Sequence, residues 1–317
     1  MLEEVDLIAV ASAEALGADS KRLAPTAVRE VVGAGVDCAI VAGPLCLGQD
    51  AAEMFIDAGV HCLLTQPCAL ALESLPDVSR WFEDAGLIGA VGNLDRYTPA
   101  VQELRRRLAL GQLGALYQIS TRREGGASAR DQDALTLQDV TAQNLDLTTW
   151  LAASPYRTIS AVSTGPVGRR GAEMISVTGS LSDDKVVNHV VNDLSPLFEH
   201  VISVTGERGH LIADLGRSTL TFHASVTHPA DAWETATLFR RVGEGDEIRY
   251  VLRQTEPLRL QHQVFWEAVR GQGCDVVTFR EGAHTLSVMK AVMMSTRTGN
   301  AVQVGPVSGV GRVAEPA

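Results

Sequence analysis

Two glutamines, Gln66 and Gln143, lie at positions where the type of side chain decides what chemistry is possible. Gln66 follows the apolar run 60–64, and Gln143 lies in a segment that also holds Asp139 and Asp146. A glutamine side chain ends in an amide, which donates and accepts hydrogen bonds but does not ionise. It cannot take up or release a proton near neutral pH. Neither glutamine can therefore serve as a proton donor or acceptor in a reaction.

The elements that position Gln66 belong to a first half in which short apolar runs alternate with helical patterns. The predicted strands are 7–11, 38–42, 60–64 and 87–91. Continuous apolar strands separated by helices indicate a parallel sheet covered on both faces. We expect a truncated, Rossmann-like doubly wound sheet, and we assign residues 1–114 to this first domain.

The second half, residues 115–317, changes to long strands of alternating hydrophobicity, and late helices follow at 258–270 and 283–297. Sequential alternating strands joined by turns indicate an antiparallel sheet. We expect an α+β domain with a large, open-faced, mainly antiparallel sheet. Its predicted strands are 115–120, 173–179, 185–192, 199–205, 210–214 and 218–223.

Composition narrows the function classes. The net charge is −11 without a long charge block, which opposes binding to a phosphate backbone. No apolar run reaches the ~20 residues that span a membrane, and the acidic start is unlike a signal peptide. We expect a cytoplasmic protein with no nucleic-acid or membrane partner. The five cysteines form no CxxC pair and the histidines show no ligand spacing, so we expect no metal site.

Several segments together resemble the Gfo/Idh/MocA family of nicotinamide-dependent sugar oxidoreductases. The segment 92–101 (GNLDRYTPAV) is similar to the family's Gly-x-Asn-x-Arg-Phe-x-Pro-x-Val, and 111–114 (GQLG) to its Gly-x-Leu-Gly turn. The segment 143–151 (QNLDLTTWL) resembles His-x-x-Asp-Leu-x-x-Trp-Leu, and 265–271 with 297–299 resembles the usual ending. Their order and spacing imply this family's fold over most of the chain.

The resemblance also implies which side chains transfer protons in the family, and here the chain departs. Where family members read Glu-Lys-Pro, this chain has Gln66, and where they carry the histidine of Asp-x-Gly-x-His, it has Gln143; Asp139 and Asp146 are retained. A positioned acid or base contributes about 10²–10⁴-fold to a rate. We interpret Gln66 and Gln143 as degenerate positions, and the two aspartates as helix-capping or hydrogen-bonding residues.

The family's glycine loop for the cofactor pyrophosphate is missing near the start of the chain. Either 7–11 is the family's second strand and the loop is absent, or it is the first strand and 12–17 replaces the loop. We favour the second alignment, because removing a central strand would orphan buried backbone groups at ~1–3 kcal/mol each. The degenerate loop then includes Ser12, Glu14 and Gly17, and we expect no bound cofactor.

These departures predict a pseudoenzyme: a catalytically inactive binding protein that holds a peptide or a small-molecule pathway intermediate for partner biosynthetic enzymes. Its truncation is similar to that of peptide-binding helpers in ribosomal peptide natural-product pathways of the crocagin type. The resemblance also implies a homodimer formed through the carboxyl-terminal sheet. Two alternatives remain open. One is an NAD(P)-dependent sugar-type oxidoreductase with a mis-called or truncated start, and the other is a silent subunit of a hetero-oligomeric oxidoreductase.

Overall fold

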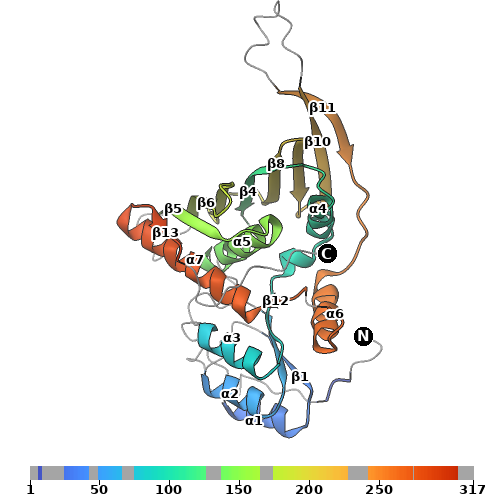
Figure 1. Cartoon of the computed structure of the whole chain (residues 1–317), viewed down its shortest axis with the longest axis vertical. Helices are drawn as coiled ribbons and strands as arrows, with labels where there is room; N and C mark the ends of the chain where they lie inside the picture. Colours follow the sequence, from blue (N-terminus) through green and yellow to red (C-terminus); the bar gives the residue numbers. More distant parts are fainter. Residues whose placement is uncertain are drawn as a thin grey trace, which may run out of the picture.

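Two β-sheets of different size, with helices packed on them, make up the chain (Figure 1). The computed structural model describes residues 6–8, 25–42, 49–65, 75–125, 137–164, 174–227, 242–273 and 275–305. In the view of Figure 1 the smaller sheet lies at the bottom and the larger one above it, and helix α7 runs between them.

The smaller sheet has four described strands in the order β1-β2-β3-β12. Strands β1 (Cys38–Val41), β2 (His61–Leu64) and β3 (Gly89–Val91) are parallel, and β12 (Val277–Thr278) pairs antiparallel to β3. The connecting helices are α1 (Pro25–Gly33), α2 (Gln49–Asp57) and α3 (Leu75–Asp84). Since parallel strands need a crossover between them, each helix returns the chain to the start of the next strand.

Helices cover both faces of this sheet, which explains why its strands are apolar at nearly every position. On one face, Cys62 and Leu64 pack into a cluster with residues of α2, α3 and α7. On the other face, Leu63 and Ala90 pack against Phe265, which lies on α6 (Pro257–Val269). The expected doubly wound arrangement is therefore present in the described part of the chain.

The larger sheet has nine described strands, in the order β11-β10-β9-β8-β4-β7-β6-β5-β13. All its neighbouring strands are antiparallel except β4 and β7, which are parallel. Its strands are β4 (Leu116–Glu124), β5 (Tyr156–Thr164), β6 (Met174–Leu181), β7 (Val186–Asn192), β8 (Glu199–Gly206), β9 (Gly209–Asp214), β10 (Thr219–Thr227), β11 (Val242–Arg249) and β13 (Val302–Gln303).

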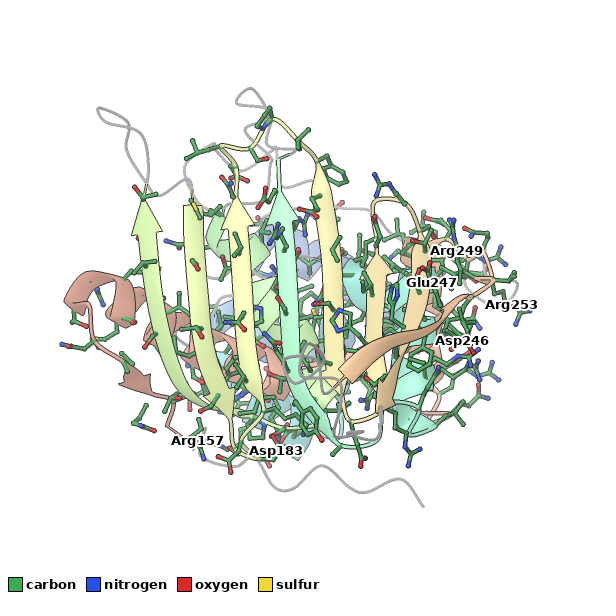
Figure 2. All side chains as sticks on the ribbon, turned by 90° about the horizontal axis from the view of Figure 1, so that it is seen from above. Arg157, Asp183, Asp246, Glu247, Arg249 and Arg253 are labelled. Atoms are coloured by element: carbon green, nitrogen blue, oxygen red, sulfur yellow. The ribbon has the colours of Figure 1, made fainter. Side chains whose placement is uncertain are left out.

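One face of the larger sheet packs on α4 (Pro99–Ala109), α5 (Leu137–Ala152) and α7 (Phe279–Thr298). Burial alternates along β8 and β9, as expected for strands with one covered face. Figure 2 looks onto the opposite face, which no described helix covers; labelled charged residues such as Arg157 and Glu247 lie toward its edges. The predicted homodimer through this face stays a prediction.

Helix α7 packs on both sheets. Its first turns, with Phe279, Ala283 and Leu286, belong to the apolar cluster of the smaller sheet. Its later residues, including Val288 and Val292, belong to the core of the larger sheet. Its start is fixed by a capping box between Thr278 and Glu281, and its end by a left-handed glycine, so its length is set locally at both ends.

The fold class expected from the sequence is confirmed: a parallel sheet precedes a large, mainly antiparallel sheet. One predicted strand is wrong where it can be checked, because Leu7 and Ile8 lie in coil and are 83% and 59% exposed. Strands β5 and β11 were not predicted. The boundary between 114 and 115 stays a prediction, although β12 adds a late segment to the smaller sheet. No helix among the described residues is long and apolar enough to cross a membrane.

Candidate functional site

A pocket lies where the carboxyl end of β3 meets α5, α7 and β12. Apolar side chains form much of its wall, and four polar side chains interrupt them. The apolar ones are Val91, Ala142, Val277 and Leu286, and the polar ones are Asn93, Gln143, Asp146 and Thr285.

The parallel strands explain why the pocket lies at this edge. Their carboxyl ends meet at one side of the sheet, which is the side where open α/β sheets bind ligands. Gly92 follows β3 there, and its N–H donates to the carbonyl of Leu64 at 2.6 Å. A Cβ at Gly92 would lie 2.3 Å from the carbonyl oxygen of Thr65. Only glycine lets the two chain segments approach so closely beside the pocket.

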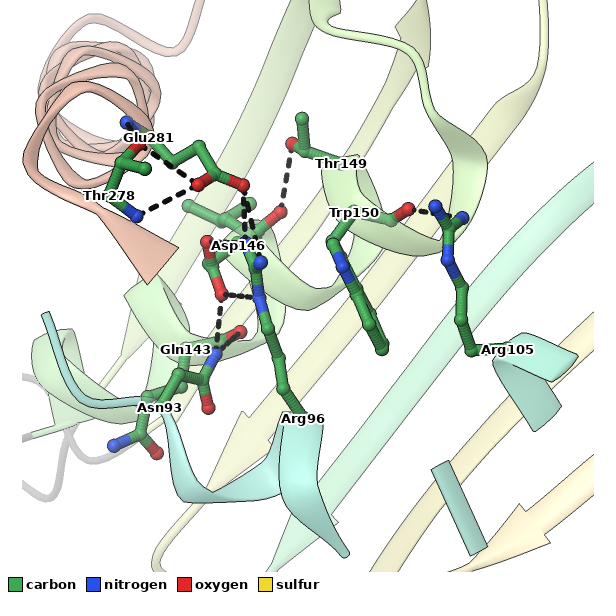
Figure 3. A network of polar contacts seen from close by, with 10 residues as sticks. Asn93, Arg96, Arg105, Gln143, Asp146, Thr149, Trp150, Thr278 and Glu281 are labelled. Carbon is green, nitrogen blue, oxygen red and sulfur yellow. Dashed lines mark hydrogen bonds and ion pairs between the residues drawn. The ribbon is translucent and has the colours of Figure 1, made fainter. Parts of the chain in front are cut away.

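A buried ion pair holds Asp146, one of the residues of the pocket wall (Figure 3). Arg96 lies on the short 3₁₀ helix η2 (Leu94–Tyr97) and is 2% exposed. Its Nε donates to Asp146 Oδ2 at 2.9 Å, and its Nη2 donates to Asp146 Oδ1 at 2.6 Å. This two-pronged geometry is the strong form of an arginine–carboxylate pair. It fixes the Asp146 carboxylate against rotation.

Glu281 completes the network from α7. Its Oε1 accepts hydrogen bonds from Nη1 and Nη2 of Arg96, each at 3.2 Å, and its Oε2 accepts the backbone N–H of Thr278 at 2.8 Å. Burial alone would lower the pKa of Arg96, but Asp146 and Glu281 raise it above its ordinary value. Arg96 is therefore charged, and it joins η2, α5 and α7 at one point.

Trp150 lies between two arginines behind this network. The guanidinium carbons of Arg96 and Arg105 lie 5.1 Å and 5.0 Å from the centre of its ring. Arg105 Nη1 also donates to the carbonyl oxygen of Trp150 at 2.7 Å. Cations over an aromatic face are attracted to it, so the indole supports the back of the Arg96 side chain.

Gln143 connects the pocket to a second charged group. Its Oε1 accepts a hydrogen bond from Arg123 Nη1 at 3.1 Å, and the same Nη1 lies 3.4 Å from Asp95 Oδ2. His200 Nε2 lies 3.5 Å from that Asp95 oxygen. Burial lowers the pKa of His200, an effect that Asp95 opposes and Arg123 reinforces, so the imidazole is neutral at pH 7. Gln143 is thus held by an arginine rather than left free in the pocket.

The positions singled out from the sequence fall into two groups. Gln143 and Asp146 both line the pocket, and Asp139 lies in the first turn of α5. The hydrogen-bonding interpretation of Asp146 agrees with its contacts, while the absence of a catalytic role stays a prediction. Gln66 and the loop residues Ser12, Glu14 and Gly17 lie outside the described residues. Within the described ranges, no group of three metal-binding side chains comes together.

Three side chains of the site were not assigned from the sequence: Asn93, Arg96 and Glu281. The segment 92–101 carried a signal for the first two, since it follows a predicted strand of the parallel sheet. Glu281 carried a weaker one, because a threonine three residues before a glutamate at a helix start is typical of a capping box. Neither signal says that the residues meet, because Arg96 and Glu281 are 185 residues apart.

Known proteins with a similar sequence are dehydrogenases. The chain is 28% identical over 155 residues to the UDP-N-acetylglucosamine 3-dehydrogenase of Acidithiobacillus ferrooxidans, a match that covers 49% of this chain and 48% of that enzyme. It is 23% identical over 281 residues to the NAD(+)-dependent scyllo-inositol 2-dehydrogenase of Bacillus subtilis, covering 85% and 78%. The first match thus spans about half of the relative's length. No family model matches the chain.

Solved structures of dehydrogenases also share the fold of this chain. The Acidithiobacillus enzyme superposes with a TM-score of 0.67 at 20% identity, over 85% of this chain and 80% of that one. A levoglucosan dehydrogenase solved with NADH and levoglucosan superposes with a TM-score of 0.68 at 14% identity, over 86% and 80%. The fold is that of Gfo/Idh/MocA-type oxidoreductases. The homologues and structural neighbours are enzymes of this type.

These relatives overturn the functional prediction made from the sequence. A catalytically inactive binding protein was expected because Gln66 and Gln143 replace ionisable residues and the glycine loop is missing, but the sequence relatives are dehydrogenases. The prediction of a pseudoenzyme is therefore wrong. The peptide-binding role and the link to crocagin-type pathways find no support in these relatives. The physical error was to give the retained Asp146 only a hydrogen-bonding role, although its carboxylate lies in the pocket wall.

Proposed function

We propose that the chain is an oxidoreductase that uses a nicotinamide nucleotide to oxidise a secondary alcohol of a sugar or cyclitol. One observation carries the proposal: a pocket with apolar walls, two amides and a carboxylate opens at the carboxyl edge of a parallel sheet. The activities of the relatives support it, because one acts on a nucleotide sugar and another on an inositol.

The described residues fit the ring end of such a cofactor. Val91, Val277 and Leu286 offer apolar surface to a flat ring, and Asn93 has a buried side-chain oxygen without a hydrogen-bond partner. An unpaired buried acceptor is what a ligand carrying an N–H or O–H group requires. When bound, the nicotinamide ring supplies the acceptor for the hydride that leaves the alcohol carbon.

The side chains of this chain would do the remaining work. Asp146 Oδ1 accepts one hydrogen bond, from Arg96, and a carboxylate oxygen has room for a second donor. We assign it the hydroxyl of the reacting alcohol and the proton that this hydroxyl loses. Gln143, held by Arg123, orients a neighbouring hydroxyl. The apolar walls keep bulk water from the reacting carbon.

The first test is binding and turnover by the full chain. Titration with NADH and NADPH, followed by fluorescence, should show saturation at micromolar concentrations for one of them. Oxidation should then be measured with UDP-N-acetylglucosamine, scyllo-inositol and levoglucosan as probes. If neither nucleotide binds up to millimolar concentration, the proposed function is wrong.

Asp146→Asn tests the assigned proton acceptor. An asparagine keeps the size of the side chain but cannot accept the proton, so kcat should fall about 10²–10⁴-fold. The matched control is Asp184→Asn, since Asp184 forms an exposed ion pair with Arg157 at 2.6 Å, far from the pocket. Unchanged turnover in a folded Asp146→Asn protein would remove Asp146 from the mechanism.

A further inference from the structure

The orientation of the Asn93 amide follows from its neighbours. Its Nδ2 lies 2.6 Å from Asp146 Oδ2 and 3.2 Å from the backbone oxygen of Gln143. Both neighbours are acceptors, and a carboxylate bound to an arginine has no proton to donate. The group facing them must therefore be the NH₂, and both of its hydrogens are used. This leaves Oδ1 as the polar side-chain atom of Asn93 that can meet a ligand.

Oδ1 is buried and has no hydrogen-bond partner, although Asn93 lines the pocket and is only 3% exposed. An unpaired buried acceptor is destabilising, because it has lost its contact with water and gained no partner. In a native structure such a group calls for an explanation. The two groups that bond to one another beside it are well paired: Asp146 accepts three hydrogen bonds, and Arg96 donates to two carboxylates. The network fixes the amide of Asn93, a residue of the pocket wall, with this acceptor unpaired.

We propose that Asn93 is a specificity-determining and positioning residue: its Oδ1 accepts a hydrogen bond from a neutral N–H or O–H group of the ligand in this pocket. The inference rests on the proposed function and deepens it. Two sources carry this chemistry, the carboxamide N–H of a nicotinamide ring and a hydroxyl of the sugar or cyclitol. A carboxylate or phosphate group is excluded at this point, because it has no proton to offer and would meet Asp146.

The locked amide also explains why the selection should be sharp. A freely rotating asparagine can turn to present either a donor or an acceptor, so it tolerates both kinds of ligand group. Here rotation would place Oδ1 against the Asp146 carboxylate and would lose the 2.6 Å hydrogen bond. A site that presents a fixed acceptor rejects a ligand that lacks the matching donor, because the acceptor stays unpaired.

The test compares ligand pairs that differ only in this donor. The first pair is NAD⁺ and 3-acetylpyridine adenine dinucleotide, in which a methyl group replaces the carboxamide NH₂. The second is scyllo-inositol and a deoxyfluoro analogue, in which fluorine replaces a hydroxyl, measured with the preferred nucleotide present. Affinities are measured by calorimetry for the wild type, Asn93→Leu and Asn93→Ser; the serine variant shortens the side chain without adding apolar bulk.

Asn188→Leu is the matched control. Asn188 lies on β7, where it accepts from Gln118 at 2.7 Å and donates to Thr178 at 3.1 Å, so this substitution also removes a doubly bonded amide. Thermal melting establishes that each variant is folded before its affinities are compared.

In the wild type, the donor-bearing member of one pair should bind about 10-fold more tightly or better. That preference should disappear in Asn93→Leu and Asn93→Ser and persist in Asn188→Leu. If the preference disappears for the nucleotide pair, the carboxamide is the hydrogen-bond donor to Asn93. If it disappears for the inositol pair, the hydroxyl is the donor. Wild-type binding without a preference, or a preference that survives both Asn93 variants, overturns the inference and leaves the proposed function intact. Absence of any binding by the wild type overturns both.

Discussion

The two sheets reach stability by different means. In the smaller sheet, β2 and β3 are buried on both faces by apolar neighbours, such as Phe55 and Phe265. In the larger sheet no described helix covers one face, and the covered face includes a buried polar pair, His189 and Thr121. The smaller sheet should therefore respond mainly to changes of volume, and the larger one also to pH.

The pocket lies where these two kinds of packing meet, and helix α7 contributes apolar side chains to both of them. A polar joint is made there by Arg96 with the carboxylates of Asp146 and Glu281. A buried ion pair adds little net stability over an apolar replacement of all its members, but removal of one member is costly. The joint is therefore the place where a single substitution should have the largest effect.

Arg96→Met should have that largest effect. Methionine fills much of the space but leaves Asp146 buried without its cation, so we expect a loss of about 3–5 kcal/mol in the free energy of unfolding. Chemical denaturation followed by circular dichroism measures it. Arg280→Met is the control: Arg280 also pairs with a glutamate, Glu83, but both side chains are about 40% exposed. That change should cost at most about 1 kcal/mol.

The double variant Arg96→Met, Asp146→Leu sharpens this result. It removes the unpaired buried carboxylate, so it should recover part of the stability that the single variant loses. If the two losses simply add, the cost at Arg96 comes from packing and not from charge.

His189 gives the pH dependence expected of the larger sheet. Burial lowers the pKa of His189 to about 3, and its two ring nitrogens bond to Thr121 and Tyr156, each at 2.8 Å. Below about pH 6.5 the unfolded chain takes up a proton at this residue while the folded protein does not. Stability should therefore fall as the pH is lowered, by up to ~1.4 kcal/mol per pH unit from this residue.

Denaturation at several values between pH 7 and pH 5 checks this. Other buried histidines, including His200 and His284, have lowered pKa values as well and add to the slope. His189→Gln should reduce the slope of stability against pH by the contribution of this one residue, which is up to ~1.4 kcal/mol per pH unit. An unchanged slope in a folded His189→Gln protein would mean that this imidazole is already protonated in the native state.

Of the substitutions at Arg96, His189 and Phe279, Phe279→Leu should have the smallest effect. It tests whether the stability of the smaller sheet is independent of pH. Phe279 is buried, and its ring meets that of Phe82 edge to face at 5.2 Å. Loss of the aromatic pair should cost about 1 kcal/mol. Because no proton is gained or lost, the same cost is expected at pH 7 and at pH 5. A cost that changes with pH would show that the two sheets do not respond independently.

Much of the fold was predictable because strong local patterns agree with it. The parallel strands were found from apolar runs, since burial on both faces leaves no polar position in them. Strand β5 was missed because Arg157, Thr158 and Ser160 give it no apolar alternation at its start. Strand β11 was missed for a related reason. Its sequence, VGEGDEIR, is rich in glycine and charged residues, and it is a strand because it pairs with β10.

The site was predictable only in part, because its geometry depends on contacts between distant segments. The sequence placed Gln143 and Asp146 near a reaction centre, and both line the pocket. It did not show that Asn93 and Arg96 hold Asp146 from 50 or more residues away. Because the contacts of Asn93 and Arg96 with Asp146 could not be foreseen, the substitutions at Gln66 and Gln143 and the missing glycine loop were interpreted as a loss of catalysis. A site read from single positions omits the groups that only folding brings together.

Strand β12 and helix α7 have a consequence for how the protein is made. The smaller sheet takes its fourth strand from Val277–Thr278, and Phe279 then packs into its cluster. While the ribosome is still translating the larger sheet, the amino-terminal strands lack this strand and this ring. Most of the polypeptide must leave the exit tunnel before the first-made segment can reach its final packing, so the nascent chain exposes apolar surface that molecular chaperones recognise.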